Sequence, residues 1–292
     1  TKCKPCEDDI NKAPIWQIRA LKSHRNVENG IIEYENVILD VYDIPVFYVP
    51  YISHADPSIK KSSGLLSPKI TSNTIFGLSY SQPYYFELSE YRDITITPTM
   101  TSNEGLIIKT NYRSLRAKGS SNIKTSFTRG SHVNIDGKES NKFRGHVDLK
   151  LAEKINKNWT VGLNAIRASD FSYLSRYKMG HDSDGILTQR AYLSGNDKDF
   201  YAKVDAMYFQ PLNAFKSNRN VPLVLPNIKI VWHKNYNNGI QRKIVVDGNL
   251  ASKADASNSQ KISLKSSWSK YKISESGHIF KAKFSGRADV YR

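Results

Sequence analysis

Residues 143–151 read F-R-G-H-V-D-L-K-L, and this stretch decides the fold class. Apolar and polar side chains take alternate positions along it: Phe143, Val147, Leu149 and Leu151 against Arg144, His146, Asp148 and Lys150. Successive side chains of a β-strand point to opposite faces, so the stretch predicts a strand with one apolar and one polar face.

The same alternation is the dominant signal after about residue 74, and no stretch shows a helical period. It predicts about twelve or thirteen strands, over 62–72, 75–87, 92–101, 105–116, 119–128, 142–153, 157–168, 185–194, 198–210, 227–234, 242–252, 260–269 and 278–291. Soluble sheets usually have strands of about five or six residues, whereas membrane-barrel strands need about nine to eleven. The chain is therefore expected to be all-β, with a transmembrane antiparallel β-barrel over 61–292.

The connectors between these segments differ in length. Those over 129–141, 169–184 and 211–226 are long and polar, and those over 117–118, 154–156 and 195–197 are short. Outer-membrane barrels show this asymmetry between external loops and periplasmic turns. The alternation still runs at Tyr291. Because an open sheet edge is costly in lipid, further strands are expected to close the barrel in the intact protein.

Residues 1–60 have a different pattern. Two short strands are expected around Trp16–Ala20 and Ile31–Tyr34, followed by the nearly continuous apolar run Val41–Tyr51. Such a run is typical of a strand buried on both faces. These residues are therefore expected to form a small soluble β-domain that precedes the barrel.

The charge of the chain permits another interpretation. Lys and Arg number 43 against 27 Asp and Glu, a net charge of +16, which suits a soluble protein that binds nucleic acid. The basic residues are spread through the alternating segments instead of forming a patch, so nucleic acid is not the expected partner. No run of 18 apolar residues occurs, so no membrane-spanning helix is expected.

Two cysteines, Cys3 and Cys6, stand in C-K-P-C. A zinc ribbon needs a second pair, so structural disulfides are favoured over metal binding, with each other or with cysteines beyond residue 292. No G-x-S-x-G, H-E-x-x-H or Gly-rich phosphate loop occurs, so neither an enzyme nor a cofactor is predicted.

Several strings resemble the LptD family, also called organic-solvent-tolerance or LPS-assembly proteins, in its alphaproteobacterial form. The most specific is I-P-V-F-Y-V-P-Y at 44–51, followed by D-P-S-I-K-K and G-L-L-S-P up to residue 68. Others are C-K-P-C-E-D-D, P-I-W-Q-I-R-A, Q-P-Y-Y-F-E-L, R-A-S-D-F-S-Y-L-S-R-Y and G-R-A-D-V-Y. The resemblance runs over most of the chain.

This resemblance implies a function. Residues 1–60 would end a periplasmic β-jellyroll, and 61–292 would be roughly the first half of a large outer-membrane barrel. The barrel would hold an LptE-type plug lipoprotein, and the periplasmic bridge protein LptA would deliver lipopolysaccharide to the jellyroll. The acyl chains would enter the membrane through an opening between jellyroll and barrel, and the saccharide would cross the lumen and leave through a lateral gate where the first and last strands meet. A porin-like diffusion channel is the alternative; a loop folded into the lumen, over 169–184 or 211–226, would favour it.

The resemblance also places Pro68 and Pro83 in the first two barrel strands. Proline cannot donate a ladder hydrogen bond, so the pair would weaken the wall where it must part. The plainer alternative is that Pro68 suits an edge strand and Pro83 marks a bulge.

Ten cations share the polar register: Lys109, Arg113, Arg144, Lys150, Lys203, Lys243, Lys265, Lys281, Lys283 and Arg287. They would line the lumen and favour the phosphates of lipopolysaccharide, or simply belong to a hydrated wall.

Overall fold

The computed structural model describes residues 15–27, 30–58, 61–133, 139–180, 185–212, 221–253 and 256–292. These residues form two compact units. The first takes the chain up to Gly64 together with Tyr85–Glu90, and the second takes Leu65–Tyr84 with Tyr91–Arg292. The all-β prediction is confirmed, because antiparallel strands dominate and the one helix described, α1 (Tyr173–Arg176), has four residues.

The first unit contains a three-stranded antiparallel sheet of β1 (Trp16–Asn26), β2 (Ile31–Val41) and β3 (Ile44–Ala55). The expectation of one buried strand over 41–51 is wrong in two respects. The chain turns at Tyr42 and Asp43, whose φ angles of 50° and 61° suit a tight hairpin. The apolar side chains of β3 are also exposed (63% for Phe47), because no second layer covers this sheet among the described residues.

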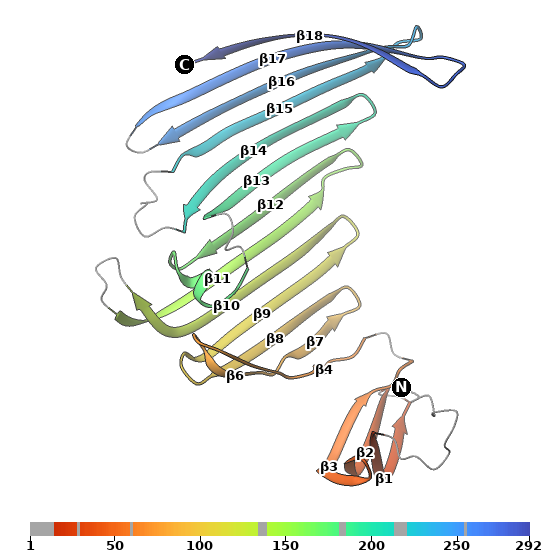
Figure 1. Ribbon diagram of the computed structural model, residues 1–292, viewed down its shortest axis with the longest axis vertical. Coiled ribbons are helices and arrows are strands. Elements are labelled where there is room, and N and C mark those ends of the chain that lie inside the picture. Colours follow the sequence, from red (N-terminus) through yellow and green to blue (C-terminus); the bar gives the residue numbers. More distant parts are fainter. Residues whose placement is uncertain are drawn as a thin grey trace. The chain divides into compact units, whose positions relative to one another are not determined.

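The second unit is built on one long antiparallel sheet, in which nearly every strand pairs with its neighbours in sequence (Figure 1). The first strands of this sheet are β4 (Gly64–Leu65), β5 (Lys69–Asn73), β6 (Gly77–Ser81), β7 (Tyr84–Ser89), β8 (Arg92–Thr101), β9 (Gly105–Arg116), β10 (Gly119–Val133) and β11 (Glu139–Lys154). Of these, Gly64 of β4 and all of β7 but Tyr84 are counted in the first unit. The later ones are β12 (Trp159–Ala168), β13 (Ile186–Asp197), β14 (Phe200–Pro211), β15 (Leu223–Asn235), β16 (Ile240–Lys253), β17 (Ala256–Ile273) and β18 (Ile279–Tyr291).

The strands differ from their predicted ranges in several places, and β15 and β17, for example, begin four residues earlier than predicted. The predicted strands 62–72 and 75–87 are each broken in two, so that β4 and β5 replace the first and β6 and β7 the second. β10 and β11 are longer than predicted, and their connector is therefore shorter than 129–141. Both strands extend because their pairing continues as far as Val133 and Glu139.

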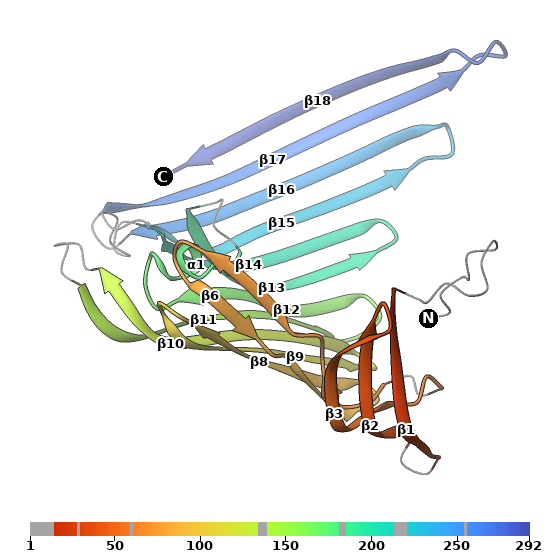
Figure 2. The same cartoon turned by 60° about the horizontal axis from the view of Figure 1, so that its bottom comes forward.

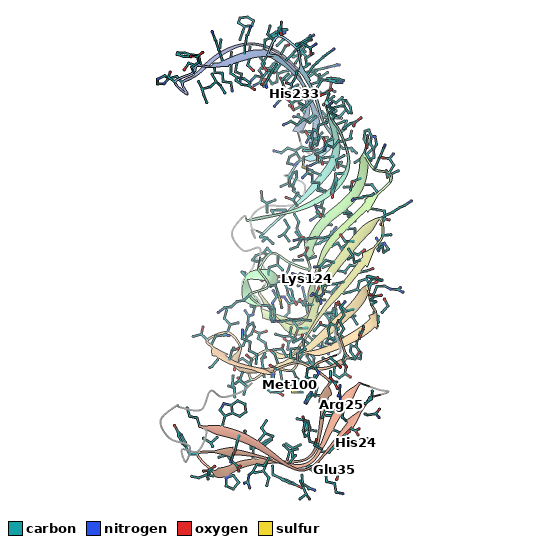
Figure 3. All side chains as sticks on the ribbon, turned by 90° about the vertical axis from the view of Figure 1, so that its right-hand side faces the viewer. His24, Arg25, Glu35, Met100, Lys124 and His233 are labelled. Carbon is teal, nitrogen blue, oxygen red and sulfur yellow. The ribbon has the colours of Figure 1, made fainter. Side chains whose placement is uncertain are left out.

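The two faces of this sheet differ as the alternation predicts. Arg144 is 1% exposed on one face, whereas Phe143 is 73% exposed on the other. The sheet is curved, and α1 lies on its concave side (Figures 2 and 3), which is the face of Arg144. The convex face exposes large apolar side chains along its whole width, among them Leu106, Phe143, Val147, Val161, Val204, Trp232, Leu264 and Phe284.

Within the described residues, no helix has the length and apolar character needed to cross a membrane.

Candidate functional site

The two prolines expected at the gate lie at the strand breaks. Pro68 directly precedes β5, and Pro83 directly precedes β7. Proline has no backbone N–H, so neither residue donates to a neighbouring strand. One backbone hydrogen bond still crosses the breaks, from the Leu66 N–H to the Pro83 carbonyl (2.9 Å). The predicted strand 75–87 is thus weakly paired with the predicted strand 62–72 at this point.

Gln82 occupies the break between β6 and β7 and bridges it with its side chain. Its Nε2 donates to the Leu66 carbonyl (2.8 Å) and to the Pro83 carbonyl (3.3 Å). Its Oε1 accepts from the Tyr80 hydroxyl (2.8 Å), and its backbone N–H donates to the Pro98 carbonyl on β8 (3.1 Å). A side-chain amide therefore replaces part of the ladder that the prolines interrupt. The sequence offered no signal for this contact.

The loop after β12 folds back onto the concave face of the sheet. We call residues 169–180 the docked loop. Arg144 from β11 holds it through a bidentate pair with Asp170 (2.7 and 2.9 Å) and a bond to the Ser172 hydroxyl (2.8 Å). Planar two-point pairs of this kind are strong and orient both partners.

The other end of the docked loop is held by Glu104, which lies in the turn between β8 and β9. Arg176 donates to Oε1 of Glu104 through Nε (2.9 Å) and Nη2, and the Tyr177 hydroxyl donates to Oε2 (2.6 Å). Tyr173, Leu174 and Tyr177 are almost fully buried. They pack into the hydrophobic cluster of this unit with Ile107, Ile166, Ala168 and Leu187.

This packing shifts the pKa values of two side chains in the docked loop, Asp170 and Tyr177. Burial disfavours the charged form of Asp170, but the Arg144 guanidinium and the hydroxyls of Ser169 and Ser172 outweigh it and hold the pKa of Asp170 at about 2. Burial, with the neighbouring Glu104 carboxylate, raises the pKa of Tyr177 well above its usual range. Asp170 therefore stays ionised and Tyr177 stays neutral at physiological pH.

The strand pairings place all ten predicted cations on one face of the sheet. For example, Arg113 faces Asn122, which faces Lys150, which in turn faces Asn164 and then Arg190. Several of the cations have carboxylate partners on that face: Arg113 with Asp93, Arg144 with Asp170, Lys203 with Asp205, and Arg287 with Asp289. Lys281 and Lys283 are exposed on β18. The positive charge of the face is thus partly neutralised and unevenly distributed.

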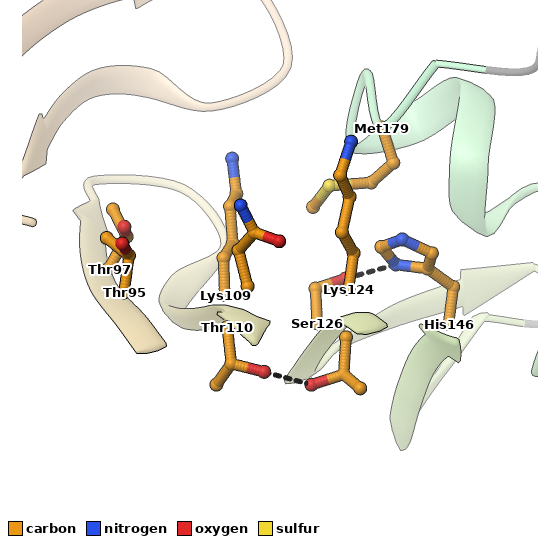
Figure 4. Close-up of a pocket in the computed structure, with 10 residues that line it drawn as sticks. Thr95, Thr97, Lys109, Thr110, Lys124, Ser126, His146 and Met179 are labelled. Carbon is orange, nitrogen blue, oxygen red and sulfur yellow. Dashed lines mark hydrogen bonds between the residues drawn. The ribbon is translucent and has the colours of Figure 1, made fainter. Parts of the chain in front are cut away.

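A pocket of about 310 Å³ lies on the same face, with Met179 of the docked loop at its rim (Figure 4). Strands β8 to β11 supply its other lining residues: Thr95, Thr97, Lys109, Thr110, Asn111, Lys124, Thr125, Ser126 and His146. Ser126 lies at the centre of a chain of contacts, because its Oγ is 2.6 Å from His146 Nδ1 and 2.7 Å from the Tyr173 hydroxyl.

Cys3 and Cys6 lie outside the described residues. Within the described part of the chain, no three His, Cys, Asp or Glu side chains gather closely enough to hold a metal ion.

Comparisons with known proteins agree on one family. The family profile described as "LptD: LPS transport system D" matches residues 142–292. Proteins named "LPS-assembly protein LptD" from Shewanella oneidensis and Shewanella sp. strain ANA-3 are 30% and 31% identical, each over 68% of this chain. The protein of that name from Idiomarina loihiensis is 26% identical over 78% of it. The chain spans 25% of the two Shewanella relatives and 29% of the Idiomarina one.

Proposed function

The chain belongs to the LptD family, whose profile covers more than half of it, and on this premise we propose that it is part of a lipopolysaccharide translocon. In this proposal the protein lies in the outer membrane and inserts lipopolysaccharide into the outer leaflet. The saccharide passes through the lumen and leaves through a lateral gate beside the first strands of the barrel. The family name describes transport, so the proposed role is transport and not catalysis.

The observation that carries the proposal beyond the family name is the pair of strand breaks at Pro68 and Pro83. A gate in a barrel wall needs a seam with few ladder hydrogen bonds, since every bond must break when the wall opens. The breaks at Pro68 and Pro83, in the predicted strands 62–72 and 75–87, form such a seam, and the strands from β9 to β14 are continuous.

The two faces of the sheet support a membrane location. Exposed apolar patches of more than a few hundred Å² are uncommon on soluble monomers and mark interaction surfaces. Here exposed apolar residues lie on the convex face of β9, β11, β12, β14, β15, β17 and β18, as expected of a wall in contact with lipid. The concave face, with its serines, threonines and cations, would then line the lumen.

We assign the domains and partners on the same basis. Residues 1–60 would be the last part of a periplasmic β-jellyroll that receives the lipid from LptA, and 61–292 the first half of the barrel around an LptE-type plug.

Cys3 or Cys6 would form a disulfide with a barrel cysteine beyond residue 292, because the periplasm is oxidising. Non-reducing electrophoresis of the intact protein should show a mobility shift that Cys3→Ser/Cys6→Ser abolishes; free thiols at both positions would exclude this pairing.

A porin-like channel remains the weaker proposal. The docked loop is a feature that a porin with a constriction loop would share. The relatives are nevertheless named LPS-assembly proteins, and nothing in the comparisons favours a passive pore.

The gate proposal is tested by replacing both prolines with residues that have a backbone N–H group. In Pro68→Ala/Pro83→Ala, two added hydrogen bonds of about 1 kcal/mol each should lower the open population roughly thirtyfold. Export should slow while the barrel still assembles. The measurement is the amount of lipopolysaccharide at the surface of cells that depend on the variant, divided by the folded level of the protein.

Pro222→Ala is the matched control, because Pro222 directly precedes β15 as Pro68 precedes β5. This variant should export normally. Normal export by the double variant at a normal folded level would remove the prolines from the gating mechanism.

A further inference from the structure

The pocket beside Met179 contains two lysines, Lys109 and Lys124, together with hydrogen-bond donors. None of the bonds that hold the docked loop involves these lysines. Lys109 on β9 faces Ser126, and Lys124 on β10 faces Asn111, so the two lysines are diagonal neighbours on one face. Figure 4 shows both side chains rising from the sheet in the same direction, toward the level of Met179. Diagonal neighbours in a sheet are about 7–8 Å apart, so both ammonium groups can reach one bound group between them.

Neither ammonium group has an ion-pair partner among the residues that the structure describes. This distinguishes them from Arg113 and Arg144, whose charges are taken up by Asp93 and Asp170. The register places one further cation, Lys69, on the same face, in the row of Ser81, Thr99 and Ile107. The pocket is therefore a local excess of positive charge.

One carboxylate opposes this excess. Asp148 on β11 faces Lys124 directly. The remaining polar lining consists of hydroxyls, the Asn111 amide and His146. The Asn111 Nδ2 group and the hydroxyls of Thr95 and Thr97 can donate hydrogen bonds to an anion. Asn111 Oδ1 is buried without a hydrogen-bond partner, and as an acceptor it would take a hydrogen bond from an ammonium group or from a hydroxyl of the ligand.

We propose that this pocket binds a phosphate group, held between the ammonium groups of Lys109 and Lys124. A pocket of about 310 Å³ is at the lower end of the size of small-ligand sites, so a phosphorylated sugar ring fits the class of ligand. The phosphate could belong to a glycolipid in transit or be free in solution. Only the first source rests on the proposed transport function; the anion site itself does not.

The test is lysine footprinting on the intact, full-length protein in neutral detergent. An amine-reactive acetylating reagent is applied, and mass spectrometry gives the modification rate at Lys109, Lys124 and the control Lys157, which is exposed in the turn between β11 and β12. Three probes are compared: inorganic phosphate, a bisphosphorylated lipid A-type glycolipid, and the same glycolipid without its phosphates. At a probe concentration ten times the Kd, modification of Lys109 and Lys124 should slow roughly tenfold, and Lys157 should be unaffected.

The pattern across the probes identifies the source. Protection by the phosphorylated glycolipid but not by its dephosphorylated form supports a glycolipid in transit, and protection by inorganic phosphate alone supports a site for the free ion. Equal rates with and without both phosphate probes would overturn the site, as would equal protection of Lys157. In a second arm, Lys124→Gln should abolish the protection of Lys109 and Lys124→Arg should retain it. These readouts do not depend on export, so they separate failure of the site from failure of the transport proposal.

Discussion

At position 130 the docked loop comes so close to β10 that a single methyl group decides whether it fits. A Cβ added to Gly130 would contact the Tyr177 hydroxyl and would lie 2.8 Å from Oε2 of Glu104. Both groups are buried and hydrogen-bonded to each other, so neither can move away without breaking that bond. Overpacking of this kind costs about 1–3 kcal/mol.

We therefore expect Gly130→Ala to undock the loop while the sheet stays folded. Trypsin should then cleave the variant after Arg176 and Lys178 at a higher rate than it cleaves the parent protein. Gly248→Ala is the control, because the nearest atom to its added Cβ is the Lys261 carbonyl oxygen at 3.7 Å. Equal cleavage of all three proteins would show that the loop is not anchored at position 130.

Asp170 makes the docking depend on pH. Its pKa is about 2 in the docked loop, below the value of about 3.9 of a free aspartate. A lowered pKa means that ionisation stabilises the docked state. This contribution is complete above about pH 4 and is lost as the pH falls toward 2. Protonated Asp170 no longer forms the charged pair with Arg144.

A spin label on Ser175→Cys, in a variant without other cysteines, should therefore be immobile at pH 7 and at pH 5 and become mobile between about pH 4 and pH 2. Asp170→Asn should mobilise the label at every pH and remove the transition. A transition centred near neutral pH would mean that another group controls docking.

The sequence predicted that Arg144 lies on the polar face, because alternation has a fixed period of two. It did not predict the partners of Arg144, since Asp170 lies in a loop, where side-chain direction follows no period. The same holds for Glu104 and its contacts with Arg176 and Tyr177.

Among the elements, β4 to β7 differ most from the prediction. The alternation continues through 62–72 and 75–87, so the pattern predicted two unbroken strands. Proline removes hydrogen bonds without removing the alternation, and the pattern therefore does not report the breaks. The register of the strands from β8 onward agrees with the pattern because one polar and one apolar face fix it.

The strength of the seam should depend on Gln82. In Gln82→Met, the bonds from Nε2 to the Leu66 and Pro83 carbonyls are lost, at a cost of about 1 kcal/mol each. Hydrogen exchange at the Leu66 N–H should accelerate by roughly tenfold or more. Tyr80→Phe removes only the hydroxyl that orients the amide and should have a smaller effect in the same direction. Unchanged exchange in Gln82→Met would mean that the side chain does not hold the seam.

At the scale of the whole molecule, the convex face should behave as a lipid-facing surface. Val147 lies in the middle of β11 on that face, and Lys150 lies on the concave face of the same strand. If the convex face meets lipid, Val147→Arg should destabilise the intact protein by about 2–4 kcal/mol. Lys150→Arg keeps a charge in the same place and should have little effect. Urea unfolding in lipid vesicles measures both, and an unperturbed Val147→Arg protein would place this face in water.

Glu104 and the docked loop also constrain the order in which the chain assembles. Glu104 is 72 residues before Arg176 and 73 before Tyr177, and the strands β9 to β12 lie between them. Closing so long a loop costs conformational entropy that the contact itself must offset. The neighbouring hairpins need much shorter loops and form sooner. Docking is therefore a late folding event, and it occurs only after four strands have found their register.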